Sequence, residues 1–101
     1  MIVRIWHGYA SPAQPDDYPK HFHHNVLPEL RAIAGFLGAS LLRQDTGGRI
    51  EFIVLTRWTS IDAVRAFAGA QLTRAVVEPA AIAALVDYDR VVQHYELVEE
   101  G

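Results

Sequence analysis

The chain has 101 residues, a formal net charge of −3 and no cysteine. That length provides one domain, residues 1–101, with one hydrophobic core, and the lack of thiols excludes disulfides and every cysteine-based catalytic or metal site. Half of the residues are hydrophobic, and acidic and basic residues are interspersed, so we expect no binding to nucleic acid.

Residues 2–9 (IVRIWHGY) are mostly β-branched or aromatic and predict a first strand. Alternation divides its side chains between two faces: Val3, Ile5, His7 and Tyr9 on one, and Ile2, Arg4, Trp6 and Gly8 on the other. This opening does not have the pattern of a signal peptide, and no apolar run approaches the about 20 residues of a membrane helix. We therefore expect a cytoplasmic protein that does not enter the membrane.

Residues 16–35 predict the first helix, with Asp16 or Asp17 as its cap and Gly35 at its end. Apolar side chains recur at steps of three and four residues: Tyr18, Phe22, Val26, Leu30 and Ile33. Pro28 has no backbone N–H, so we expect a kink over residues 24–27.

Three histidines lie on this helix. His21 and His24 fall opposite the apolar stripe, where we expect a solvated face rather than a metal site, because no carboxylate lies at a matching spacing. His23 lies at the edge of the stripe and could reach a pocket.

Residues 37–45 and 49–58 predict the second and third strands, joined by a Thr46-Gly47-Gly48 turn. Both faces of the third strand are largely apolar: Ile50, Phe52, Val54, Thr56 and Trp58 form one, and Glu51, Ile53, Leu55 and Arg57 form the other.

Ser60 caps a second predicted helix, which carries Val64 and Phe67 on its apolar stripe and ends at Gly69. Residues 72–77 and 79–86 predict two short helical segments, and residues 88–98 predict a fourth strand.

This order predicts an α+β fold: a ferredoxin-like βαββαβ sandwich, whose four-stranded antiparallel sheet has helices on one face. The other face, to which we assign Trp6, Ile53 and Leu55, would leave a large apolar patch in water. We therefore expect a homodimer through this face. Arg4 and Arg57 would lie on the same side and pair with Glu51 or Glu96 across strands.

The third strand and the residues after it carry a family resemblance. Residues 51–60 (EFIVLTRWTS), together with Asp62-Ala63 and Phe67, resemble the antibiotic biosynthesis monooxygenase family of the dimeric α/β barrel superfamily. Residues 35–38 are similar to that family's "PGF" entry to strand two, with Ala34 in place of proline, and His94-Tyr95-Glu96 resembles one of its branches. The resemblance implies a dimeric α/β barrel and, for some members, oxidation of phenols without metal or flavin. We therefore expect no cofactor and no metal.

Two mechanisms within the family can be compared residue by residue. Haem-degrading members use an asparagine, a tryptophan and a histidine at positions that match His7, Phe67 and approximately Val77, and valine cannot ligate iron. Quinone-forming members use an asparagine, a tryptophan, a tyrosine and an arginine. The matching positions here are, in the same order, Val54, Trp58, Val64 and the region of Arg74.

Three residues are candidates for catalysis. Trp58 could stack on an aromatic ligand or hold an oxyanion through its N–H, and His7 could deprotonate a phenol. His94 could meet His7, because strands one and four are neighbours in this fold. Six further residues could line the pocket and bind substrate: Tyr9, Phe22, His23, Val54, Val64 and Phe67. Each of these residues also has a purely structural interpretation, in the core or at the rim.

Three functions follow from these alternatives. The first is a cofactor-independent monooxygenase acting on a small aromatic compound of phenolic or quinone type. The second is a non-catalytic dimeric barrel that binds a ligand. The third is a haem-binding protein that uses His7, His23 or His94.

Overall fold

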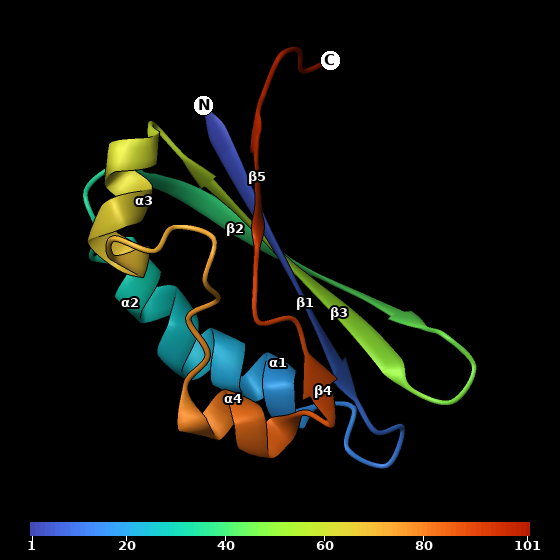
Figure 1. The fold of residues 1–101 in the computed structure, drawn as a ribbon. Helices are drawn as coiled ribbons and strands as arrows, with labels where there is room; N and C mark the ends of the chain where they lie inside the picture. The colour runs from blue at the N-terminus through green and yellow to red at the C-terminus, as the bar shows by residue number, and fades with distance from the viewer.

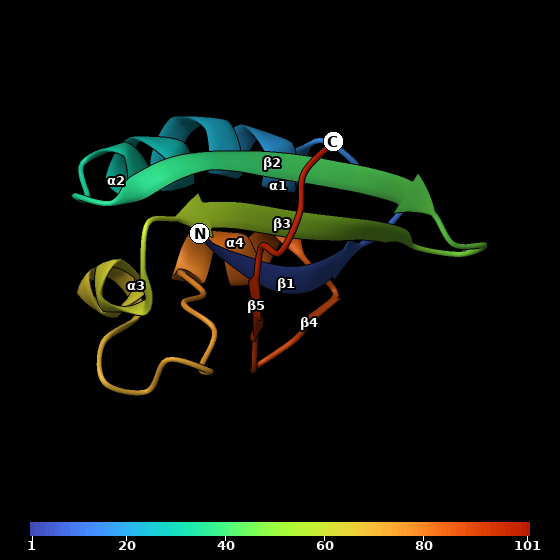
Figure 2. The same ribbon diagram turned by 90° about the horizontal axis from the view of Figure 1, so that it is seen from above.

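One antiparallel sheet crosses the molecule, and the helices all lie to one side of it (Figures 1 and 2). The computed structural model describes all 101 residues, from Met1 to Gly101. In chain order its elements are β1 (Ile2–Ala10), α1 (Asp17–His21), the π-helical η1 (Phe22–Val26), α2 (Leu27–Arg31), β2 (Phe36–Asp45), β3 (Ile50–Trp58), α3 (Ile61–Ala68), α4 (Pro79–Ala84), β4 (Asp87–Tyr88) and β5 (Gln93–Glu96).

The strand order is β2-β3-β1-β4, with β5 also paired to β1. This is the ferredoxin-like arrangement expected from the sequence, and the helices cover one face of the sheet as expected. The predicted fourth strand is divided into β4 and β5. Between them, residues 90–92 leave β1 and bond to residues 73–75 through Ala75 N–H to Arg90 O (2.9 Å) and Val92 N–H to Thr73 O (2.7 Å). Residues 72–77, predicted to be helical, therefore form an irregular segment instead.

The pairing of β1 with β3 decides which side chains face the helices. Trp6 lies opposite Val54, and His7 lies opposite Ile53. Partners in antiparallel strands project to the same face, so Trp6 points toward the helices, where it is 9% exposed. His7 points to the uncovered face. Our assignment of the two faces of β1 was therefore wrong: Trp6 does not share a face with Ile53 and Leu55.

The first helix is continuous from Asp17 to Arg31 but has a π-helical middle. The N–H of Leu27 donates to the carbonyl of Phe22, a five-residue step. Pro28 cannot donate to the preceding turn, and the widened turn is where we predicted a kink.

The signals at the two ends of α3 act as expected, whereas Asp16 makes no side-chain cap hydrogen bond to α1 and the first helix ends at Arg31, before Gly35. The Ser60 hydroxyl accepts a hydrogen bond from Ala63 N–H at 3.2 Å and begins α3, and Gly69, with φ 78°, ends it. Gly35 has φ 90°, and a Cβ there would lie 2.5 Å from the Cβ of Ala63. A residue other than glycine would push α3 away from the end of α2.

Two hydrophobic clusters lie between the sheet and the helices. The larger is formed by Trp6, Ala10, Tyr18, Phe22, Phe52, Val54, Ala81, Ala84 and Val92, and the smaller by Leu30, Trp58 and Val64. None of the helices is long and apolar enough to cross a lipid bilayer.

Candidate functional site

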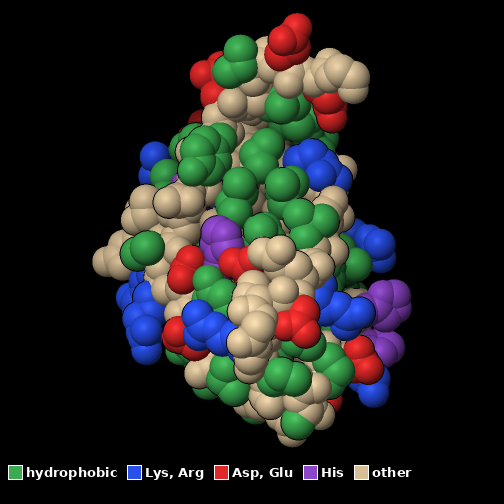
Figure 3. Space-filling model, turned by 90° about the vertical axis from the view of Figure 1, so that its right-hand side faces the viewer, with side chains coloured by type: hydrophobic (Ala, Val, Ile, Leu, Met, Phe, Trp, Pro, Cys, Tyr) green, Lys and Arg blue, Asp and Glu red, His purple; other side chains and the backbone are tan.

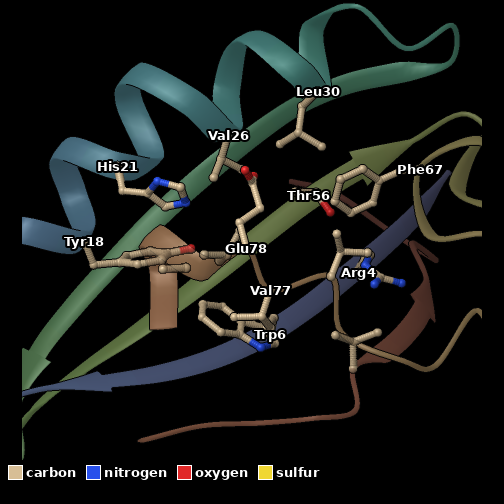
Figure 4. A pocket seen from close by; sticks show the side chains of 14 residues that line it. Arg4, Trp6, Tyr18, His21, Val26, Leu30, Thr56, Phe67, Val77 and Glu78 are labelled. Carbon is tan, nitrogen blue, oxygen red and sulfur yellow. The ribbon is translucent and has the colours of Figure 1, made fainter. Parts of the chain in front are cut away.

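A cavity lies between the inner face of the sheet and the helices, beside the irregular segment 69–78 (Figure 4). Its volume is about 50 Å³, room for a few water molecules. Ten of its 14 lining residues are hydrophobic. Aromatic walls come from three elements, Trp6 on β1, Tyr18 on α1 and Phe67 on α3, and the Trp6 and Tyr18 rings are 5.6 Å apart. Flat apolar walls of this kind suit an aromatic ring.

Arg4 brings a buried positive charge to this cavity. Its side chain is 4% exposed, contrary to our expectation that it pairs with an acidic residue on the outer face. The guanidinium donates to the carbonyls of Leu72 (2.7 Å) and Arg74 (3.1 Å), and to Nε2 of His94 (3.0 Å). Burial lowers the pKa of Arg4 from 12.5 to about 10, so it remains charged at neutral pH. No carboxylate forms an ion pair with it, so the guanidinium can attract a negatively charged oxygen of a ligand.

His21, the last residue of α1, projects into the cavity from the opposite wall (Figure 4). The side chain is 7% exposed, so our prediction of a solvated position was wrong for His21. Its Nδ1 lies 2.9 Å from the amide nitrogen of Asn25, one turn further along the helix. Its Nε2 is enclosed and has no hydrogen-bond partner.

Two further polar groups line the cavity near α4. Glu78, which precedes α4, is half-buried and belongs to none of the ion pairs in the structure. Burial, and then the negative charge of Glu78, raise the pKa of the Tyr18 hydroxyl above its usual value. Tyr18 is therefore a neutral phenol at physiological pH.

The two histidines predicted to be catalytic, His7 and His94, lie apart from each other. His7, on the outer face, forms an ion pair with Asp89 at 3.3 Å and does not line the cavity. His94 lies opposite Arg4 on the inner side, so it shares no face with His7. Burial and the charge of Arg4 lower the pKa of His94, which contacts the cavity only through Arg4.

Trp58 is completely buried outside the cavity. It packs between Phe36 and Phe67, with ring centroids 5.4 and 5.8 Å away. Its Nε1 donates to the hydroxyl of Thr56 at 2.8 Å. With this N–H already satisfied, the geometry does not provide the oxyanion contact that we predicted for Trp58.

The six predicted substrate-binding residues divide into two groups. Val54 and Phe67 line the cavity as expected. The other four do not: Tyr9 lies on the outer face under Arg49, Phe22 and Val64 are buried in the core clusters, and His23 is exposed.

The residues of the site that sequence reasoning missed include Arg4, Trp6, Tyr18, His21 and Glu78. No sequence signal identifies Arg4 and Trp6, because both faces of β1 carry large apolar side chains and the choice depends on the register of β1 against β3. For His21, the signal is the three-residue step from Tyr18, which leaves the two side chains on adjacent parts of the helix surface.

The family model described as "Antibiotic biosynthesis monooxygenase" matches residues 1–79. The haem degrader MhuD from Mycobacterium tuberculosis, with two haems bound in its active site, is similar in structure, with a TM-score of 0.66, 25% identity and coverage of 100% of this chain and 99% of that chain.

Two oxygenases from Streptomyces have the same fold. SnoaB from Streptomyces nogalater, a cofactor-independent oxygenase, is 19% identical with a TM-score of 0.65, covering 98% of this chain and 95% of that chain. The monooxygenase ActVA-Orf6 from Streptomyces coelicolor, in complex with nanaomycin D, is 17% identical with a TM-score of 0.62, covering 99% and 88%. No curated protein matches the chain in sequence.

Proposed function

The chain belongs to the antibiotic biosynthesis monooxygenase family, and we propose that it oxidises a small aromatic compound of phenolic or quinone type with molecular oxygen and without a cofactor. The observation that carries the proposal is the cavity under the helices, with aromatic walls and the charge of Arg4. The ring would lie among Trp6, Tyr18 and Phe67.

The chemistry requires an electron-rich substrate. A phenol that has lost its proton can give electrons to O₂, so that one oxygen atom enters the ring and the other leaves as water. Arg4 would favour the phenolate, because no carboxylate forms an ion pair with its buried guanidinium. The apolar walls would exclude water from the reacting ring.

The cavity must widen to admit a ring. Its volume of about 50 Å³ is smaller than the roughly 300–1,000 Å³ of ordinary ligand sites. The segment 69–78 contributes Val76 and Val77 to the wall and has no regular secondary structure. Outward movement of this segment would enlarge the cavity without breaking the sheet.

A panel of hydroxyanthrones and hydroquinones tests this function. We expect the protein to accelerate their consumption of oxygen, followed by an oxygen electrode and by quinone absorbance. Val77→Phe places a ring in the cavity and is expected to lower the rate by about 100-fold, since a misplacement of about 1 Å can cost that much. The matched control is Val91→Phe, because Val91 is 63% exposed and lies outside the cavity.

The absence of any acceleration would contradict catalysis. In that case, quenching of tryptophan fluorescence by the same compounds in the wild-type protein, and not in Val77→Phe, would support the alternative of a non-catalytic ligand-binding barrel.

Haem binding is a second candidate, favoured by the similarity to MhuD and by the unpartnered Nε2 of His21. His21 is the histidine whose free nitrogen faces the cavity, whereas His7, His23 and His94 do not line it. A haemin titration tests this function. A shift of the Soret band that is lost in His21→Phe and kept in His24→Phe would support it, and an unshifted band would exclude it.

We also propose that two copies pair through the uncovered face of the sheet. Hydrophobic side chains gather there (Figure 3), among them Val3, Ile5, Ile53 and Leu55, with Leu42 and Tyr95 about half exposed at 49% and 51%. A second copy would cover this patch, which a monomer would leave in water.

A further inference from the structure

The imidazole of His21 contains the one buried side-chain nitrogen or oxygen atom in the structure that lacks a hydrogen-bond partner. This atom is Nε2. Leaving a buried polar atom unpaired destabilises the folded state, because the atom loses its hydrogen bonds to water and gains none in the protein. Leucine or phenylalanine would fill this position without that cost. The position is therefore unfavourable for stability alone, and a partner from outside the chain would remove the penalty.

The ring of His21 is held in one orientation. On one side it packs against Tyr18, with ring centroids 6.0 Å apart, and on the other its Nδ1 bonds to Asn25. These contacts leave the unpaired edge of the imidazole directed into the cavity, on the side where Glu78 lies (Figure 4). A ligand in the cavity would meet Nε2 without any movement of the imidazole.

Asn25 can form a hydrogen bond with either neutral tautomer of the ring. Its side chain is exposed, so the amide is free to turn. With the amide oxygen toward His21, Nδ1 carries the proton and Nε2 can accept one. With the amide nitrogen toward His21, Nε2 carries the proton and can donate to a carbonyl oxygen.

We propose that His21 is a catalytic residue, which binds the phenolic oxygen of the aromatic ligand and accepts its proton at Nε2, with Asn25 as the positioning residue; this inference rests on the function proposed above. In this step the phenol O–H bond breaks, an N–H bond forms at Nε2, and the electron pair of the O–H bond stays on the oxygen. The resulting phenolate lies in the cavity that also contains the charge of Arg4. The ligand class is therefore an aromatic ring with a free hydroxyl group.

Other titratable groups face the same cavity and must be distinguished from His21. Glu78 is an alternative proton acceptor, and Tyr18 is itself a phenol whose raised pKa keeps it protonated. Arg4 remains a cation and cannot accept a proton. Glu78→Gln removes the competing acceptor while keeping its size.

The probe is para-nitrophenol, whose phenolate absorbs visible light. We expect the wild-type protein to lower the apparent pKa of the bound probe, and the imidazole ¹⁵N signals of His21 to move to the imidazolium position at the same time. His21→Phe keeps the aromatic contact with Tyr18 and is expected to abolish the shift of the probe's pKa. It should also weaken binding by about 10- to 100-fold, as expected for a lost hydrogen bond to a charged group.

The matched control is His24→Phe, the same change at an exposed position of η1. It is expected to bind the probe as the wild-type protein does. Asn25→Ala should mix the two neutral tautomers of His21 in the ¹⁵N spectrum of the free protein and weaken binding less than His21→Phe does. If Asn25 were merely structural, the tautomer ratio would not change.

Two results separate the failure of this inference from the failure of the proposed function. Nitrobenzene, which lacks the hydroxyl group, tests binding of the ring alone. If nitrobenzene and para-nitrophenol both bind, the aromatic site stands. His21 is then not the proton acceptor if the shift of the probe's pKa survives in His21→Phe or disappears in Glu78→Gln. If neither compound binds, the proposed function fails and this inference fails with it. The ¹⁵N shift in the wild-type protein decides the matter even if a variant does not fold.

Discussion

Trp58→Ala is expected to lower the free energy of unfolding by about 3–5 kcal/mol, the range measured when a buried tryptophan is removed. Trp58 is completely enclosed, and its ring contacts Phe36 and Phe67 while it packs with Leu30 and Val64. The change would leave a cavity where β3, α2 and α3 meet. Urea unfolding, followed by circular dichroism, measures the loss. Since small domains are stable by about 5–15 kcal/mol, the variant would be close to unfolding at room temperature.

Trp58→Phe separates packing from chemistry. Phenylalanine keeps most of the ring volume but removes the N–H that donates to Thr56. We expect a smaller loss of stability and unchanged binding of aromatic ligands, because Trp58 does not line the cavity. A variant that folds normally but no longer accelerates the oxidation would restore the catalytic role that the sequence suggested for this residue.

The third strand and its surroundings could be predicted from local signals. The glycines of the turn at 46–48 and the Ser60 cap mark its two ends. The buried face of β3 could be chosen because the family resemblance placed Val54 and Trp58 under the helices. Each of these inferences concerns residues within a few positions of each other, where sequence pattern is most informative.

The faces of β1 could not be predicted in this way. Both of its faces carry large apolar side chains, so alternation does not distinguish the buried face from the outer one. The choice depends on the register of β1 against β3, and a shift by one residue moves every side chain to the other face. Arg4 added to the error, because an arginine is seldom buried without an acidic partner.

His21 illustrates a different limit. A helical wheel compares side chains with one apolar stripe, but α1 is covered on a second side by α4. The π-helical turn that follows also changes the step between α1 and α2, so a single wheel does not describe both. The candidate site depends on contacts of β1 and α1, near the start of the chain, with the segment 69–78 and α4, which lie far from them in sequence.

Leu55→Asp is expected to convert the proposed dimer into a monomer. Leu55 projects from the centre of the uncovered face of the sheet, beside Ile5 on β1. An aspartate there would lose its water when two sheets pack together, and a buried charge without a partner costs several kcal/mol. The dissociation constant should therefore rise by more than about 100-fold, since each 1.4 kcal/mol is a factor of ten. Sedimentation velocity over a range of concentrations measures it.

The matched control is Ile82→Asp, because Ile82 is exposed on α4, on the helical side of the molecule. It is expected to sediment as the wild-type protein does. Wild-type protein that remains monomeric at all concentrations, or a Leu55→Asp variant as dimeric as the wild-type, would contradict the interface.

Leu55→Asp also tests whether the candidate site depends on the dimer. Leu55 faces away from the cavity, and Arg4, Trp6 and His21 all lie on the covered side of the sheet. A monomeric Leu55→Asp protein that remains folded should therefore still bind an aromatic ligand. If the dimer and ligand binding are lost together, the second copy instead holds β1 in the conformation that binds the ring. Arg4 on β1 would then hold the segment 69–78 in place through its hydrogen bonds to Leu72 and Arg74.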